Sequence, residues 1–306
     1  MYEKAIQVAT QFTRPIHIVT RSYGSQLPQP GAGTLMLIND DGWALTCKHV
    51  VAVLAQQQQI SANYTGFKAR VAAVPKRMNP KKWQRECEKH WKLLPNTTVQ
   101  IMSRFINCVD IMTGYKVVVH PQLDIALVQF QGFTKIMCKT YPVFATNGKE
   151  LAPGKGLCRL GFPFAQYTNF SYDSTADKLQ WTTTGMAQSP LFPLDGMVTR
   201  MVANPMQEPI GIELSTPGLK GQSGGPAFDV NGVIWGMQSQ TAHLDLDFDI
   251  NKEVLRGGLP KQVKDTAFLH VGHCIHVNEL KKFMRANNVL FQEQNAANSG
   301  TITAVA

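Results

Sequence analysis

Short strand-like segments separated by turns recur through both halves of the chain, and this pattern limits the fold more than any other feature. In the first half, apolar residues 35–38 and 43–46 flank a turn with the sequence Asn-Asp-Asp-Gly. In the second half, residues 227–237 hold two further segments around an Asn-Gly turn. Turns of this kind join neighbouring strands in antiparallel hairpins. Two successive halves of short strands predict a mainly all-β fold built from a pair of barrels.

The composition agrees with this fold class and argues against several others. Of the 306 residues, 44% are hydrophobic and 17% are charged, which is typical of a folded protein with a sizeable core. The sequence has no apolar run of membrane-spanning length, and its N-terminus lacks the apolar segment of a secretory signal. Its six cysteines are scattered irregularly, which favours reduced thiols. We therefore expect a cytoplasmic protein without membrane association.

The strand and turn pattern predicts two structural halves. Residues 1–145 form the first β-barrel half, interrupted by a helical insertion at about 56–110. Residues 146–290 form the second half, which ends in a helix capped by Asn278. The polar residues 291–306 are expected to be a flexible tail.

The predicted insertion carries most of the net positive charge of the chain. The whole protein has a net charge of +9, and residues 67–92 hold nine lysines and arginines against two glutamates. Residues 80–91 predict a helix that opens with a proline and aligns Trp83, Cys87 and Trp91 on one face. A solvated helix is the simpler interpretation of this segment, and contact with an acidic partner is its best candidate function. Nucleic-acid binding is the weaker alternative, because the tryptophans are better placed to anchor the insertion.

Three separated residues have the types and the local contexts of a nucleophilic catalytic site. His49 follows a predicted strand, Asp124 opens another, and Ser223 lies in a Gly-Gln-Ser-Gly-Gly-Pro turn. A serine nucleophile needs a base beside it and a third group that orients the base. Asp110 is an alternative third group, but it lacks the apolar strand that follows Asp124. The sequence favours His49, Asp124 and Ser223.

Two candidate metal sites fail on closer inspection. Three residues alternate along one predicted strand with conceivable zinc-ligand spacing, yet barrel strands alternate in the same way: His270, Cys274 and His276. Three aspartates resemble the start of a calcium loop but lack its glycine and its closing glutamate: Asp245, Asp247 and Asp249. We expect neither a metal ion nor an organic cofactor.

Several blocks of this sequence resemble the protease domain of trypsin-like serine proteases, most closely those of the HtrA/Deg type. Residues 31–51 match the strand, acidic-glycine turn and histidine block of that family. Residues 117–128 match its valine-rich strand followed by Asp-Ile-Ala-Leu, and Gly161-Phe162-Pro163-Phe164 and residues 268–286 also match. The residues after 286 are too few for the PDZ domains usual in HtrA proteins.

This resemblance implies two six-stranded antiparallel barrels of the chymotrypsin fold, with the active site between them. It also implies that Ser223 is the nucleophile, that His49 acts as general base and then general acid, and that Asp124 orients the imidazole. The backbone N–H groups of Gly221 and Ser223 would form the oxyanion hole. Without PDZ domains, we expect activity to be gated by a protein partner or by ordering of loops at 166–178 and 238–250.

The resemblance also suggests where the substrate binds. Six residues before Ser223, a protease that selects lysine or arginine would need an aspartate, and this chain has Pro217. We therefore expect the substrate residue immediately before the cleaved bond to be a small or medium apolar one. The predicted strand beside the substrate cleft contributes Ser239, Gln240 and Thr241.

Two functions remain open at this point. The leading hypothesis is a serine endopeptidase that acts on protein or peptide substrates. The alternative is a binding or scaffold protein that keeps the fold and uses the basic insertion to contact an acidic partner.

Overall fold

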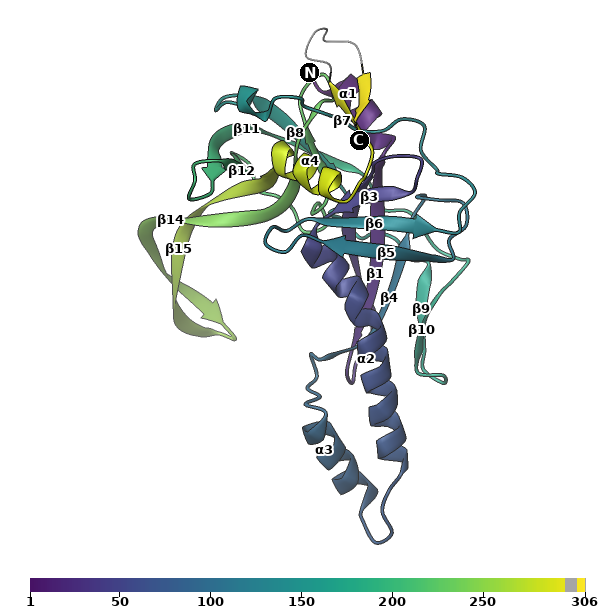
Figure 1. The fold of residues 1–306 in the computed structure, drawn as a ribbon. Coiled ribbons are helices and arrows are strands. Elements are labelled where there is room, and N and C mark those ends of the chain that lie inside the picture. The colour runs from purple at the N-terminus through teal and green to yellow at the C-terminus, as the bar shows by residue number, and fades with distance from the viewer. Residues whose placement is uncertain (295–301, 306) are drawn as a thin grey trace.

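The first half of the molecule is a six-stranded antiparallel sheet with a long helical hairpin projecting from it (Figure 1). The computed structural model describes residues 1–294 and 302–305. The elements of the first half are α1 (Glu3–Thr10), β1 (Thr13–Ser22), β2 (Gln29–Leu37), β3 (Trp43–Thr46), α2 (Lys48–Ala72), α3 (Pro80–His90), β4 (Thr98–Phe105), β5 (Gly114–Val119) and β6 (Ala126–Gln131). The strand order is β4-β1-β2-β3-β6-β5. Its two edge strands are not paired to each other within the described residues, so this sheet is a half-barrel.

The second half closes into a ring of six strands. Its elements are β7 (Val143–Phe144), the 3₁₀ turn η1 (Gly148–Glu150), β8 (Gly156–Gly161), β9 (Phe170–Asp173), β10 (Lys178–Trp181), β11 (Phe192–Ala203), β12 (Pro209–Leu214), β13 (Pro226–Phe228), β14 (Ile234–Arg256), β15 (Leu259–His276), α4 (Val277–Ala286), β16 (Phe291–Gln294) and β17 (Ile302–Val305). The ring runs β8-β11-β12-β15-β14-β13 and closes because β13 pairs with both β14 and β8. The predicted all-β fold in two strand-rich halves is confirmed.

One continuous apolar core joins the two halves. It includes Leu35 and Leu127 from the first sheet and Phe228 and Leu280 from the second half, all fully buried. Burying apolar surface is the main stabilising contribution to such a fold. The halves are therefore fixed relative to each other by shared packing, and this fixes the site that lies between them.

The helical insertion differs in extent from the sequence prediction. α2 is 25 residues long, contains His49 in its first turn and includes Gly66, so this helix begins before the predicted insertion at about 56. The predicted helix at 80–91 is confirmed as α3, whose Asn79 side chain accepts hydrogen bonds from two backbone N–H groups. Phe67, Trp83 and Cys87 form a separate small core where α2 and α3 meet. The predicted range 56–110 was too wide, because β4 pairs with β1 and belongs to the sheet.

Of the two segments expected to become ordered as loops, residues 238–250 lie within β14, and residues 166–178 contain β9 and the turn that leads to β10. β14 and β15 continue beyond the ring as a two-stranded arm that pairs as far as Arg256 and Leu259 (Figure 1). β9 and β10 form a second hairpin. The connection between them is held by Asp177, whose carboxylate forms ion pairs with Arg21 at 2.6 Å and Lys68 at 3.0 Å. Both segments are ordered in this structure.

Three sequence predictions differ from the structure in the second half: the cap of α4, the place of residues 143–144, and the extent of the C-terminal tail. The side chain that caps α4 belongs to His276, whose Nδ1 accepts a hydrogen bond from the Asn278 N–H, so Asn278 is not the cap. β7 pairs with β14 and β16, so the strand at 143–144 joins the second sheet and not the predicted first half. Residues 291–294 pair in β16 and are not a tail, while 295–301 and 306 lie outside the described residues.

None of the helices within the described residues is long and apolar enough to span a membrane.

Candidate active site

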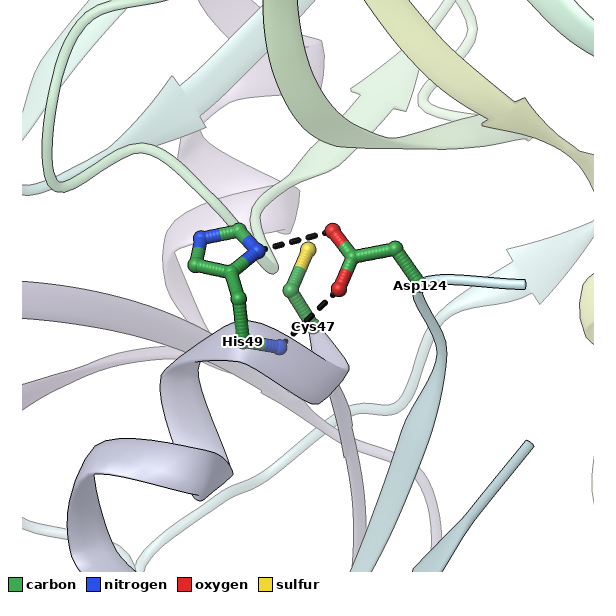
Figure 2. Close-up of side chains that lie close together, drawn as sticks. All are labelled: Cys47, His49 and Asp124. Carbon is green, nitrogen blue, oxygen red and sulfur yellow. Dashed lines mark hydrogen bonds and ion pairs between the residues drawn. The ribbon is translucent and has the colours of Figure 1, made fainter. Parts of the chain in front are cut away.

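His49 lies in the first turn of α2, and the Asp124 carboxylate holds it from a neighbouring loop. The backbone N–H of His49 donates to Asp124 Oδ1 at 2.9 Å, and the imidazole Nδ1 lies 2.8 Å from Asp124 Oδ2 (Figure 2). The first N–H groups of a helix have no partner within the helix, and they favour a negative charge. One carboxylate thus completes the start of α2 and orients the imidazole. With Nδ1 engaged, Nε2 is the ring nitrogen left for other chemistry.

A tight turn before β6 places Asp124 at this position. The His120 ring nitrogen Nδ1 accepts hydrogen bonds from the N–H groups of Gln122 and Leu123 at 3.1 and 2.9 Å. The Lys48 ammonium donates a hydrogen bond to the His120 carbonyl at 3.0 Å, which joins the turn to the start of α2. This contact between the turn and the start of α2 holds Asp124 beside His49.

The environment of Asp124 keeps it ionised. Burial disfavours the charged carboxylate, but hydrogen bonds from His49 and from the Ser239 hydroxyl at 2.6 Å outweigh this and lower its pKa. The alternative residue, Asp110, lies elsewhere and accepts hydrogen bonds from Thr134, Lys135 and Ile111. The structure brings His49 together with Asp124 and not with Asp110.

Ser223 stands on a turn that requires glycine on both sides. Gly221 has φ +100°, and a Cβ on it would lie 2.6 Å from the Phe162 carbonyl oxygen. Gly224 has φ +91°, and a Cβ there would meet the Thr34 carbonyl oxygen at 2.0 Å. The close approach of backbone to backbone at both positions explains the Gly-Gln-Ser-Gly sequence.

Thr34 ties this turn to the first half. Its hydroxyl donates to the Gly221 carbonyl at 2.7 Å and accepts from the Phe162 N–H at 3.2 Å. Its own backbone N–H donates to the Ser223 carbonyl at 3.1 Å. Thr34 is fully buried on β2, so a single residue of the first sheet positions the serine turn of the second half.

Ser223 and His49 line one cavity of about 440 Å³, together with Gly221. In this structure the Ser223 hydroxyl donates to the Ser239 carbonyl at 3.1 Å, and it makes no hydrogen bond to His49. The backbone N–H groups of Gly221 and Ser223 donate to no other group in the described part of the chain. The cavity therefore combines an imidazole, a hydroxyl and two unused backbone donors.

A second cavity, of about 400 Å³, adjoins Ser223. The residues predicted to bind substrate all line it: Pro217, Ser239, Gln240 and Thr241. The exposed side chains of His243 and His270, at the base of the β14–β15 arm, stand beside each other on the same cavity. The structure thus gathers the predicted binding residues into one pocket next to the serine.

Sequence reasoning missed the polar pair behind this second cavity. Gln238 is 2% exposed and lines the cavity, and the fully buried Arg159 of β8 donates to its Oε1 at 2.8 Å. Arg159 also donates to the Thr216 carbonyl at 3.0 Å. Burial lowers the pKa of this guanidinium. The available signal was a charged residue inside the apolar run Leu157-Cys158-Arg159-Leu160.

Cys47 is the remaining side chain of the site. Ligand atoms of Cys47, His49 and Asp124 lie within 4.8 Å of one another, which is the one grouping of potential metal ligands within the described residues (Figure 2). Burial, followed by the charge of Asp124, raises the pKa of the Cys47 thiol well above its usual value, so the thiol stays protonated. Its Sγ lies 3.2 Å from the Gln238 carbonyl oxygen, in the geometry of a hydrogen bond to the neighbouring strand.

The zinc alternative on β15 does not assemble. His270 is exposed on the arm, Cys274 is buried against Gln238, and His276 caps α4 from a buried position. They are not brought together as ligands within the described residues.

Comparison with known families identifies the class of protein. Residues 33–237 match the trypsin-like peptidase domain, so the chain belongs to this family. No curated protein matches the chain.

The solved structures that are similar to it include two proteases. An HtrA-type protease, AlgW, solved with a tripeptide, has 13% sequence identity and a TM-score of 0.46, over 94% of this chain and 63% of that one. The Rv3671c protease from M. tuberculosis, in its active form, has 12% identity and a TM-score of 0.45, over 92% of this chain and 82% of that one. The chain thus spans less than two thirds of the AlgW chain.

Proposed function

We propose that this protein is a serine endopeptidase in which Ser223, His49 and Asp124 form the catalytic triad. One observation carries the proposal: Asp124 holds the His49 imidazole by Nδ1, and that imidazole lines the same cavity as Ser223. Membership of the trypsin-like peptidase family supports the same reaction and a protein or peptide substrate.

The reaction forms and then hydrolyses an acyl-enzyme. Ser223 Oγ attacks the substrate carbonyl carbon while His49 Nε2 takes the hydroxyl proton, and the carbonyl oxygen becomes an oxyanion bound by the N–H groups of Gly221 and Ser223. The C–N bond then breaks as His49 gives the proton to the leaving amine. His49 Nε2 then takes a proton from a water molecule as its oxygen attacks the ester carbonyl carbon. The bond from that carbon to Ser223 Oγ breaks, His49 returns the proton to Oγ, and the carboxylic acid product leaves.

The hydroxyl of Ser223 must turn from the Ser239 carbonyl toward His49 before it reacts. Catalytic hydrogen bonds are often absent without substrate and form in the complex. We propose that a protein partner drives this rotation and so gates the activity. Cytoplasmic location remains part of the proposal and rests on the scattered cysteines.

Labelling with a fluorophosphonate tests the proposal. The wild-type protein is expected to become labelled at Ser223, and Ser223→Ala is expected to lose the label. Ser61→Ala, which changes an exposed serine of α2, is the matched control and should label like the wild type. Absence of labelling both in the isolated protein and after addition of cell extract would contradict the proposal and favour the scaffold alternative. Full activity of the isolated chain would contradict the gating.

A further inference from the structure

The buried Arg159 fixes which end of the Gln238 side chain faces the substrate-binding cavity. A guanidinium group donates hydrogen bonds and accepts none. Because Arg159 Nη1 lies 2.8 Å from Gln238 Oε1, the amide oxygen must face Arg159. The amide nitrogen therefore lies on the other side of the group.

That nitrogen points to the wall of the cavity beside Ser223. Gln238 Nε2 donates to the Gln240 carbonyl at 2.9 Å, and a Cβ on Gly218 would lie 2.2 Å from it. Gly218 and Gln240 both line the cavity. An amide nitrogen has two N–H groups, so the second can donate to an acceptor that enters the cavity.

The positive charge of Arg159, behind Gln238, also favours an anion in the cavity. Arg159 is fully buried, its Nε has no hydrogen-bond partner, and it forms no ion pair with a carboxylate among the described residues. Asp195 attracts it only from beyond ion-pair distance. A buried and unpaired charge is costly, so an arriving anion would offset part of that cost.

The lining of the cavity matches a particular anionic side chain. Lys220 stands exposed at its rim, and its described lining residues include no aspartate or glutamate. Pro217 and Leu219 add apolar wall next to the polar end at Gln238. Glutamate has two methylene groups for the apolar wall and a carboxylate for the donor at its end.

We propose that this cavity selects substrates with a glutamate immediately before the bond that is cleaved. Arg159 is a positioning residue that acts through Gln238, and Lys220 attracts the carboxylate at the rim. The inference rests on the proposed serine endopeptidase function, and it replaces the apolar preference expected from sequence.

Peptidyl phosphonates test the preference, because they label the serine at a rate set by the side chain in this cavity. Three probes with identical flanking residues would carry glutamate, leucine or lysine side chains next to the phosphonate. The glutamate probe is expected to label at least about tenfold faster than the other two, as for a hydrogen bond to a charged group. A generic fluorophosphonate, which carries no such side chain, reports Ser223 reactivity separately.

Two variants test the residues. Gln238→Glu would accept from Arg159 and offer no N–H, so the glutamate-to-leucine rate ratio should fall at least about tenfold. Lys220→Gln, at the exposed rim, should lower the ratio several-fold, and it keeps the test available if Gln238→Glu fails to fold. Gln180→Glu, the same change at an exposed position of β10, is the matched control and should leave the ratio unchanged.

The outcomes separate the two claims. Generic labelling of Ser223 with equal or faster labelling by the leucine or lysine probe would overturn the glutamate preference and leave the protease function standing. Absence of generic labelling as well would overturn the function and, with it, the preference. An unchanged ratio in both variants would overturn the roles of Gln238 and Lys220.

Discussion

Asp124 links two tasks at the scale of single residues, since one carboxylate completes the first turn of α2 and orients the His49 ring. The sequence shows the residue types, but the helix-capping role depends on a carboxylate 75 positions away along the chain. The N-cap residue itself, Cys47, makes no side-chain capping bond. Replacing Asp124 should therefore affect both catalysis and local order.

Asp124→Asn should lower the rate of peptide cleavage by about 10⁴-fold, because an amide that donates toward Nδ1 favours the wrong imidazole tautomer. The rate constant for fluorophosphonate labelling of Ser223 should fall as well, because it also depends on His49 activating the hydroxyl, and it is the quantity to measure. Because Asp124 has a lowered pKa when folded, its contribution to stability is present above its unfolded pKa and is lost as pH falls through the folded value. A labelling rate close to that of wild type would contradict the role of Asp124.

His276 should make the protein sensitive to mild acid. Burial lowers its pKa to about 4 from the usual 6.5, so the unfolded chain takes up the proton first as pH falls. Stability from this group is complete above about pH 6.5 and is lost between there and pH 4. Asparagine can cap a helix without titrating, so His276→Asn should lose less unfolding free energy between pH 7 and pH 4.5 than the wild type.

Denaturant unfolding at the two pH values measures this difference. His90→Asn, at an exposed histidine of α3, should follow the wild type. Equal losses in His276→Asn and wild type would show that His276 does not cause the acid sensitivity.

At the scale of elements, a buried ion pair joins α4 to β16 and to the segment after β7. Lys281 Nζ lies 2.6 Å from Glu293 Oε1 and donates to the carbonyls of Ala145 and Thr146 at 2.7 and 2.8 Å. The exposed fractions of Lys281 and Glu293 are 4% and 11%. This pair makes residues 291–294 part of the fold, which the polar sequence there did not indicate.

Lys281→Met should destabilise the protein by roughly 3–5 kcal/mol, because it leaves the Glu293 carboxylate buried without this partner. The adjacent Lys282→Met is the matched control, since Lys282 is 58% exposed and should change stability little. Unfolding in denaturant gives both values. A loss under about 1 kcal/mol for Lys281→Met would mean that Arg285, which also contacts Glu293, suffices to hold the C-terminal strand.

At the scale of the whole molecule, Thr34 of the first sheet is a polar link between the two halves, in addition to their shared apolar core. Thr34 holds the Ser223 turn by two hydrogen bonds and Phe162 by a third, and the Thr46 hydroxyl donates to the Thr34 carbonyl at 2.6 Å within the first sheet. Both threonines are fully buried. The shape of the serine turn therefore depends on the half of the chain that carries His49.

Thr34→Val should keep the volume of the side chain but leave the Gly221 carbonyl and the Phe162 N–H without their partner. We expect a loss of about 1–3 kcal/mol in unfolding free energy and slower labelling of Ser223. Thr140→Val, at an exposed position, is the control for the same change. Unchanged labelling in a destabilised Thr34→Val protein would show that the turn keeps its shape without this link.

The α2–α3 hairpin and the β14–β15 arm project from the body of the molecule (Figure 1). The sequence predicted part of the hairpin but not the arm. The proline, the capping Asn79 and the stripe of Trp83 and Cys87 predicted α3 correctly, because these are local signals. The length of α2 was not predicted, because its glutamine-rich middle lacks an apolar period and the helix is supported by packing against α3 and β4. The β14–β15 arm was read as a loop, since its aspartates are poor strand formers.

The sequence by itself determined the short strands, their hairpin turns and the three blocks that carry His49, Asp124 and Ser223. These follow from local causes: alternation of apolar residues, turn chemistry and glycines where the backbone needs them. The tertiary structure decided that the Asp124 carboxylate accepts from the first turn of α2, that Thr34 holds the Ser223 turn, and that Arg159 lies behind Gln238. Each of these contacts joins residues far apart in the chain, and no local pattern in the sequence encodes which distant partners packing will bring together.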